Sequence, residues 1–258
     1  MGSLLFRGRE GGEFEKAADC AVALGGQRGA AFLGDFDADG LLDVFAVSEN
    51  PCRIWQNRGA GKFEETMVQS GEIEHVYNGK GISGNTCDFN SDGRQDVFVA
   101  YADREPQLFF NRDFRSFGHA HEVDLAESGR LPETHRGIQA GLVADLDGDG
   151  AQDMAVVAPG GDVWVIRRDR GDPPLSCRAV LPLGEGYPGP LSVTAWDDDV
   201  CLGAWNVVAG GSAALFGKAE GGLLRLKWRF PGGQEQSREV EVLKPIRVEL
   251  PMGEKAKP

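Results

Sequence analysis

The stretch DFDADGLLD at residues 35–43 decides how this 258-residue chain is interpreted. Two related stretches follow it, DFNSDGRQD at 88–96 and DLDGDGAQD at 145–153. All three fit the pattern D-x-[DN]-x-D-G-x-x-D, and together they hold eleven of the chain's 40 acidic residues. Carboxylates packed this closely repel one another unless a cation lies among them. We name the three stretches Asp loops 1, 2 and 3, and we predict that each binds a metal ion.

Oxygen ligands at alternating positions suit calcium, and the glycine at the sixth position allows the sharp turn that curls a loop around an ion. The seventh residue would add its backbone carbonyl, and the ninth residue, an aspartate, would complete the site. The expected ligands are Asp35, Asp37, Asp39, Leu41 and Asp43 in loop 1, Asp88, Asn90, Asp92, Arg94 and Asp96 in loop 2, and Asp145, Asp147, Asp149, Ala151 and Asp153 in loop 3. Because Asn90 is neutral, the site in loop 2 should be the weakest. So many protein ligands leave no open catalytic position, and the three ions should therefore be structural.

An EF-hand is excluded, because its loop needs a glutamate at position 12, where these loops have Ala46, Val99 and Val156. Apolar, strand-like residues follow each loop, as at 44–47, and they also precede loops 1 and 3, as at 30–33. Each loop is therefore predicted to form the turn of a β-hairpin. The alternative, a solvated Asp-Gly turn without metal, is disfavoured by three copies at matching offsets.

The spacing of the loops indicates the fold, because they begin at residues 35, 88 and 145 and so recur every 53 to 57 residues. In phase with them recurs a strand of aromatic or aliphatic residues that usually runs into a polar turn, at 4–8, 54–59, 108–112, 163–166 and 214–217. A period of about 40–55 residues with about four short strands per unit is typical of β-propeller blades. Helical periodicity is almost absent, so the chain is predicted to be all-β.

The length suits a β-propeller of about five blades, with calcium loops in three of them. Four whole repeats would be completed by a fifth blade that the N-terminal and C-terminal strands share, which removes exposed strand edges. The unit at 191–205 contains three consecutive aspartates but lacks the loop glycine, so we predict a plain hairpin without an ion there. An open arc of a longer propeller is the alternative to the closed ring.

The repeated D-[FL]-[DN]-x-D-G-x-x-D-[VM], followed in two copies by an aromatic strand and Asn-Arg, resembles the FG-GAP/VCBS repeat of integrin-type β-propellers over roughly residues 1–170. Residues 215–220, 224–228 and 231–233 are similar to the ASPIC/UnbV segment that follows such repeats in cartilage acidic protein-like proteins. The segment is shorter here, and two residues separate its tryptophan from its proline. The resemblance implies propeller repeats at 1–222 and C-terminal strands at 223–258 that close the propeller.

Composition excludes several classes of function. The net charge of -13 argues against nucleic acid as a partner, because binding to phosphates needs clustered Lys and Arg. No window approaches about 18 consecutive apolar residues, so no membrane span is expected. The five cysteines show no C-x-x-C spacing, which disfavours a zinc or thioredoxin-like site, and their odd number favours reduced thiols.

Two functions fit these features. The first is a non-catalytic interaction module, in which calcium stiffens the propeller hairpins and the loops bind a protein or carbohydrate ligand. The alternative is a propeller-scaffold enzyme of lyase or hydrolase type with its active site in the central funnel, for which Glu74, Asp103, Glu122 and Asp198 are candidate acids. Fold alone does not decide between them.

Calcium loops of modest affinity and the family resemblance favour an extracellular or periplasmic location. No signal peptide is expected within the sequence, since it lacks a basic region followed by an apolar one at its start.

Overall fold

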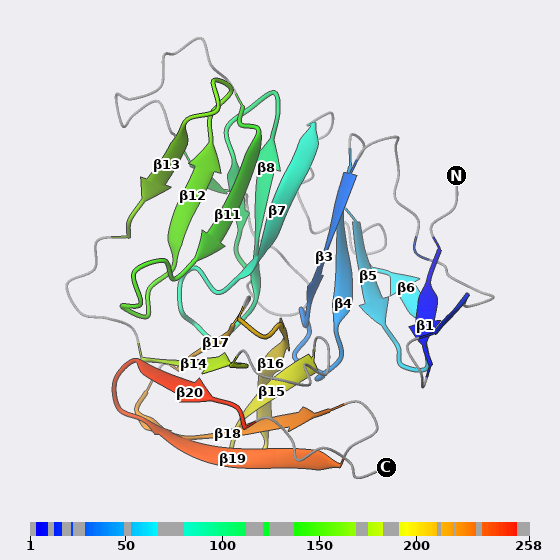
Figure 1. The fold of residues 1–258 in the computed structure, drawn as a ribbon, viewed down its shortest axis with the longest axis vertical. Helices are drawn as coiled ribbons and strands as arrows, with labels where there is room; N and C mark the ends of the chain where they lie inside the picture. Colours follow the sequence, from blue (N-terminus) through cyan, green and yellow to red (C-terminus); the bar gives the residue numbers. More distant parts are fainter. Residues whose placement is uncertain are drawn as a thin grey trace.

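A computed structural model describes residues 4–9, 13–16, 22, 29–48, 53–66, 80–111, 121–123, 137–168, 175–182, 191–210, 213–218, 220–230 and 234–251. Every regular element in these ranges is a β-strand, so the predicted all-β class is confirmed (Figure 1). Across the same ranges, no helix is long and apolar enough to cross a membrane.

Three antiparallel sheets have their strands in chain order, and we call them the meander sheets. The first contains β3 (Gly29–Gly34), β4 (Asp43–Ser48), β5 (Arg53–Asn57) and β6 (Phe63–Glu65). The second contains β7 (Gly81–Cys87), β8 (Asp96–Tyr101), β9 (Gln107–Phe109) and β10 (His121–Glu122). The third contains β11 (Ala140–Ala144), β12 (Asp153–Val157) and β13 (Val163–Ile166).

Each Asp loop joins the first two strands of its meander sheet, as the sequence predicted. In loop 1 the residue before the loop, Gly34, pairs with the ninth aspartate, Asp43. The second and third sheets have the same register, since Cys87 pairs with Asp96 and Ala144 pairs with Asp153. The predicted hairpin turns are therefore confirmed in all three repeats.

The central strand β8 shows why these sheets stack on one another, because all six of its residues are buried. Alternate side chains of a strand point to opposite faces of the sheet. Val97 and Val99 pack in one cluster with Phe45 of the first sheet, whereas Phe98 packs in another with Met154 of the third. The second sheet thus lies between the other two, with β3, β7 and β11 at neighbouring positions (Figure 1).

The C-terminal strands form a sandwich of two sheets. One layer has the order β17-β14-β20, made of β17 (Ala214–Gly217), β14 (Ser176–Val180) and β20 (Ile246–Glu249). The other has the order β16-β15-β18-β19, made of β16 (Val200–Val207), β15 (Leu191–Asp197), β18 (Gly222–Arg229) and β19 (Glu235–Val242).

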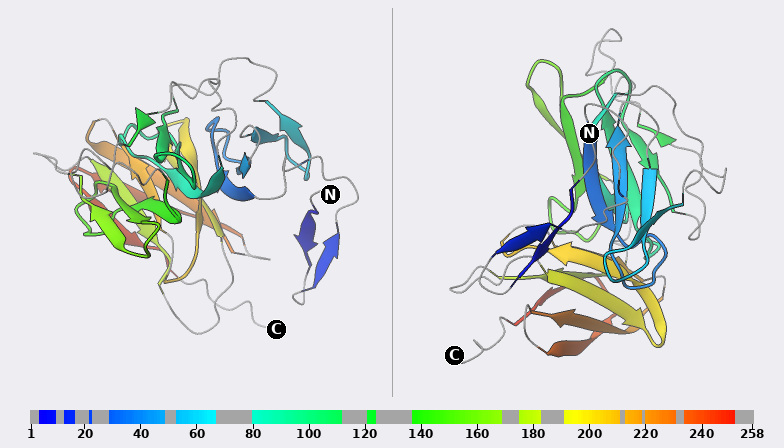
Figure 2. Two further views of the ribbon diagram at one scale, coloured as in Figure 1. Left: turned by 90° about the horizontal axis from the view of Figure 1, so that it is seen from above. Right: turned by 90° about the vertical axis from the view of Figure 1, so that its right-hand side faces the viewer.

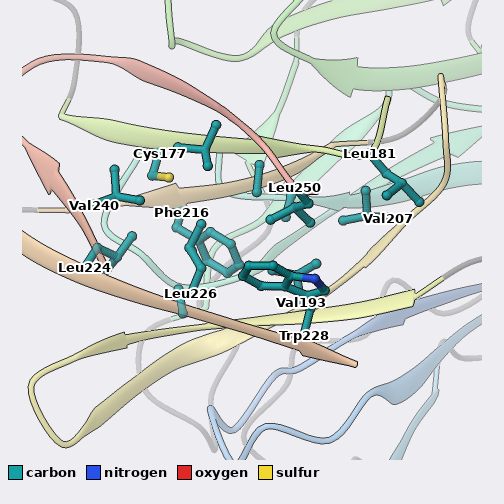
Figure 3. Packing of buried hydrophobic residues seen from close by; sticks show 14 of the residues in the cluster. Cys177, Leu181, Val193, Val207, Phe216, Leu224, Leu226, Trp228, Val240 and Leu250 are labelled. Carbon is teal, nitrogen blue, oxygen red and sulfur yellow. The ribbon is translucent and has the colours of Figure 1, made fainter. Parts of the chain in front are cut away.

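One apolar core holds the two layers of the sandwich together. In β18, the buried Leu224, Leu226 and Trp228 alternate with more exposed residues, which is the pattern of a strand with one face on a core. They pack with Cys177 and Phe216 of the opposite layer (Figure 3). Figure 2 shows this sandwich lying against one end of the meander sheets.

The strand pairing corrects the predicted ring. In the part of the chain that the structure describes, β18 pairs with β15 and β19, and β20 pairs in parallel with β14. The N-terminal strands β1 (Phe6–Gly8) and β2 (Phe14–Lys16) form a separate hairpin. The prediction that the C-terminal strands close a ring with the N-terminal ones is therefore wrong there, and three meander sheets replace the four whole repeats expected.

The physical reason is that alternating apolar residues favour a half-buried strand without specifying its partner. The strand at Ala214–Gly217 has the recurring pattern of the predicted blades, but it pairs with β14 inside the sandwich. The hairpin predicted at 191–205 is confirmed, since β15 pairs antiparallel with β16.

Candidate metal centre

Loop 1 is curled by hydrogen bonds from its own backbone to its carboxylates. The two oxygens of Asp35 accept the N–H groups of Asp39 at 3.1 Å and of Gly40 at 2.9 Å. Asp39 in turn accepts the N–H group of Leu41 at 2.8 Å. Gly40 has a φ of 87°, a left-handed conformation that glycine adopts without a steric penalty. The sixth-position glycine thus has the conformational role that the motif predicted for it.

Loop 2 repeats this arrangement. Loop 3 differs in one bond, since the Oδ1 of Asp145 accepts the N–H group of Gly148 at 2.7 Å in place of that of the fifth residue. Asp88 accepts the N–H groups of Asp92 at 3.0 Å and of Gly93 at 3.2 Å, and Asp145 accepts that of Gly150 at 3.3 Å. Gly93 and Gly150 both have a φ of 90°. The same residue types therefore produce the same turn in each meander sheet.

The carboxylates at positions 1, 3 and 5 come together in loops 1 and 3. The groups whose carboxylate oxygens lie within 4.8 Å of one another are Asp35, Asp37 and Asp39, and Asp145, Asp147 and Asp149. In loop 2 the third position is Asn90, whose amide nitrogen donates to Asp92 at 3.0 Å. Clustered carboxylate oxygens are ligands that calcium prefers, so the donor set of loops 1 and 3 fits this ion.

The ninth aspartate of each loop has a structural role that the sequence reasoning missed. The two oxygens of Asp43 accept the N–H groups of Phe36 at 3.1 Å and of Asn57 at 2.7 Å. Asp96 and Asp153 accept the equivalent pairs of N–H groups at 2.9 to 3.2 Å. All three side chains are buried and tie the loop to the strand that follows its hairpin. Their further role as metal ligands stays a prediction.

The seventh residues are held near the fifth-position carboxylates. The N–H groups of Leu41, Arg94 and Ala151 donate to these carboxylates at 2.7 to 2.9 Å. That their carbonyl oxygens bind the ion stays a prediction.

Burial raises the pKa of several carboxylates in loops 1 and 2. Removal from water is the main cause, and nearby aspartates add to it. The pKa of Asp35 and that of Asp96 are raised to about 8, and those of Asp43 and Asp88 to about 7. A cation among these groups would favour their ionised form, because its positive charge offsets both effects.

Loop 3 already has cationic side chains beside it. The Nη1 of Arg178 lies 3.2 Å from the Oδ2 of Asp145, and the Nη1 of Arg167 lies 3.7 Å from the Oδ2 of Asp147. Arg178 belongs to β14 of the sandwich, so this ion pair joins the sandwich to loop 3. These two arginines thus partly balance the negative charge of loop 3, and the motif gave no indication of them.

The eighth residue of loops 2 and 3 links each loop to the preceding one. The Oε1 of Gln95 accepts the N–H group of Asp35 at 3.2 Å, and its Nε2 donates to the carbonyl of Ala204 at 2.6 Å. The Oε1 of Gln152 accepts the N–H group of Asp88 at 2.9 Å. The motif accepts any residue at its eighth position. The glutamine that loops 2 and 3 share there is the sequence signal that could have predicted the bond to the preceding loop.

The Asp loops lie where the meander sheets meet the sandwich. Gly217 of β17 donates its N–H group to Asp88 at 3.1 Å. Together with the Gln95–Ala204 bond and the ion pair of Arg178, this contact means that loops 2 and 3 bond directly to sandwich strands. The conformation of these loops therefore affects how the two parts of the molecule dock.

Three of the four candidate acids of the enzyme alternative lie among the described residues. Asp103 follows β8 and accepts the N–H group of Lys80 at 2.9 Å. Asp198 lies in the turn between β15 and β16, with a φ of 51°. Glu122 lies in β10, and Glu74 falls outside the described residues.

The cysteines that the structure describes are free thiols, namely Cys87, Cys177 and Cys201. Burial raises the pKa of Cys177 to about 12 and that of Cys201 to about 11, so both stay protonated at neutral pH. The reduced state expected from the sequence stays a prediction.

Comparison with known proteins agrees with the loop geometry. Residues 35–84 and 88–156 match the family model of the FG-GAP-like repeat, so the chain carries FG-GAP-like repeats. The chain is also similar to cartilage acidic protein 1 of Homo sapiens, with 27% identity over 192 residues. This match covers 69% of the chain and 27% of the human protein, so the chain spans about a quarter of the length of this relative.

Proposed function

We propose that this chain is a calcium-stabilised, non-catalytic interaction module, in which the three meander sheets are blades of the β-propeller type. The FG-GAP-like repeats support an interaction role, and the meander order of the strands supports the blade assignment. Each Asp loop would bind one calcium ion through the side chains at positions 1, 3, 5 and 9 and the carbonyl at position 7. The ligand of the module would be a protein or a carbohydrate.

The observation that carries the calcium proposal is the clustering of carboxylate oxygens in loops 1 and 3. Ionising several neighbouring carboxylates that are partly removed from water costs free energy. At neutral pH this cost remains unless a cation binds among them or some of them keep a proton. The raised pKa values of Asp35 and Asp43 express this cost. A hard divalent cation removes it and satisfies the oxygens that face the inside of the turn.

The role of the ions would be structural. The Asp loops connect the first two strands of each meander sheet, and loops 2 and 3 also bond to the sandwich. Ions in these turns would fix the loop conformation on which those contacts depend. Calcium would therefore hold the meander sheets and the sandwich in one arrangement and leave their remaining surfaces free for a partner.

An extracellular or periplasmic location follows from the same proposal. Calcium there is around millimolar, which suits loops of modest affinity. FG-GAP-like repeats, which this chain carries, are typical of extracellular proteins.

Thermal unfolding with and without calcium tests the proposal. Binding to the folded state alone stabilises it by RT ln(1 + [L]/Kd), about 2.7 kcal/mol per site at a hundredfold excess over Kd. Millimolar calcium should therefore raise the Tm well above that in EDTA, and magnesium should raise it less. A variant with Asp39→Ala and Asp149→Ala should lose most of the calcium effect. Identical melting curves in calcium and in EDTA would refute the proposal.

A further inference from the structure

A cavity of about 350 Å³ lies between the first strands of the meander sheets and the sandwich. Its walls come from β3, β7 and β11 on one side and from β14, β16 and β17 on the other. Sites for small ligands are concave, mostly apolar and about 300–1,000 Å³ in volume. The cavity has the size and the position of a ligand site, and the Asp loops lie at its edge through Asp145 and Gln152.

The amide of Gln152 is the first sign that the cavity binds a ligand. This side chain is only 4% exposed and lines the cavity. Its Oε1 accepts the N–H group of Asp88, but within the described part of the chain its Nε2 donates no hydrogen bond. The equivalent Nε2 of Gln95 donates to the carbonyl of Ala204. The Nε2 of Gln152 is therefore available to donate to a ligand oxygen inside the cavity.

Arg178 supplies a second set of donors. Its Nη1 bonds to Asp145 at 3.2 Å, and among the described residues its other guanidinium N–H groups have no acceptor. The amide of Asn85 is already used, since it donates to and accepts from the backbone of Val143 at 2.8 Å. The carboxylate of Asp145 also lines the cavity, but its oxygens already accept from Arg178 and from the N–H groups of Gly148 and Gly150. The side-chain donors of Gln152 and Arg178 are therefore the groups available to a ligand. Such a set recognises an anion with planar oxygens, above all a carboxylate.

The rest of the lining is apolar and in part uncovered. Leu33 is 46% exposed and Leu142 is 44% exposed, although both belong to the first strands of meander sheets. Trp205 and Leu215 complete this part of the wall. The free energy falls when an apolar group displaces water from apolar side chains that face a cavity.

We propose that this cavity binds a small carboxylic acid with a branched aliphatic body. The carboxylate bonds to the guanidinium of Arg178 and the amide of Gln152, and the aliphatic part packs on Leu33, Leu142 and Trp205. The inference goes beyond calcium binding, because the residues that hold the acid are Arg178, Gln152 and the apolar lining rather than the proposed ligands of the ion.

The test compares N-acetyl-L-leucine with its neutral amide, N-acetyl-L-leucinamide, by isothermal titration or ligand-observed NMR. The acid should bind at least tenfold more tightly than the amide. Arg178→Gln should abolish this preference. The matched control is Arg167→Gln, which removes an exposed charge beside loop 3 but lies outside the cavity lining and should keep the preference.

Two further variants keep the test decisive if Arg178→Gln does not fold. Gln152→Glu retains the acceptor for the N–H group of Asp88 but removes the donor, so it should weaken acid binding at least tenfold. Leu142→Glu places a negative charge, like that of the ligand's carboxylate, at a partly exposed position of the lining. It should therefore also weaken acid binding at least tenfold. Equal binding of acid and amide, or no binding of either, would overturn the proposal.

Running the titrations in calcium and in EDTA separates this proposal from the calcium proposal. Preference for the acid in both buffers without any calcium binding would support the cavity assignment and refute the calcium proposal. Calcium binding without any preference for the acid would support the calcium proposal and refute the cavity assignment.

Discussion

At the scale of single residues, the aspartates of one Asp loop have different roles. The ninth aspartate accepts two backbone N–H groups and is buried, whereas the fifth is more exposed and accepts an N–H group of its own loop. Removing the ninth leaves buried donors unsatisfied, which is costly with or without an ion. Removing the fifth mainly takes away one of the proposed oxygen ligands of the ion.

Asp96→Ala should therefore destabilise the chain even in EDTA, by about 2–4 kcal/mol, because the N–H groups of Phe89 and Asn111 lose their acceptor. Urea unfolding in EDTA measures this loss. Asp92→Ala is the matched control, and in EDTA it should cost about 1 kcal/mol or less. Equal losses for the two variants would contradict the separate roles.

Asn90→Asp should have opposite effects in the two buffers. In calcium the additional carboxylate should raise the affinity of loop 2 about tenfold, which corresponds to about 1.4 kcal/mol. In EDTA it should lower the Tm, because a third carboxylate joins Asp88 and Asp92 and the amide bond to Asp92 is lost. Calcium titration and thermal unfolding measure the two effects. A change of the same sign in both buffers would count against a cation in loop 2.

The spacing of these residues was enough to predict the turns, because the motif prescribes which positions carry oxygens and which need a glycine. Arg178 could not be predicted in the same way. It lies 33 residues from Asp145 in the sequence, and its contact depends on how the sandwich docks. The bond from Gln95 to Ala204 spans 109 residues and was hidden for the same reason.

At the scale of elements, the Asp loops connect the two parts of the molecule. β17 approaches loop 2 so closely that a Cβ at Gly217 would lie 2.6 Å from the Oδ2 of Asp88 and 2.8 Å from the backbone of Ser91. Glycine allows this approach because it has no side chain. The docking of the sandwich therefore depends on the absence of a single methyl group.

Gly217→Ala should destabilise the chain by about 1–3 kcal/mol, because the methyl group must displace loop 2 or β17. The substitution should also weaken calcium binding by loop 2. Gly160→Ala is the control, since the nearest atom to its Cβ would be 4.0 Å away, and it should change stability by less than about 0.5 kcal/mol. Chemical unfolding of both variants gives the comparison, and equal stability of the two would contradict the tight docking.

The existence of most strands near the loops followed from local pattern, but the pairing of the C-terminal strands did not. β14 and β20 are about 70 residues apart in sequence and pair in parallel, and β15 pairs with both β16 and β18. Local alternation of apolar residues is the same for a blade strand and a sandwich strand. Blades can be predicted from a repeat only as far as its motif continues along the chain, and here the last copy of the motif is loop 3.

At the scale of the whole molecule, the acidic composition and the fold have one explanation. Eleven of the 40 acidic residues lie in three turns that join strands, and two of these turns bond to the sandwich. Three calcium ions would neutralise about six charges of the net -13 and stabilise the junction between the two parts. The chain would then depend on calcium for its stability. Calcium would also keep the proposed binding surface in one conformation.

The most direct test of this account counts the ions. Equilibrium dialysis of the whole chain against millimolar calcium, followed by metal analysis, should give three ions per chain. The variant with Asp39→Ala, Asp92→Ala and Asp149→Ala should bind none while keeping its β-strand circular dichroism spectrum. A whole chain that binds no calcium under these conditions would contradict the account.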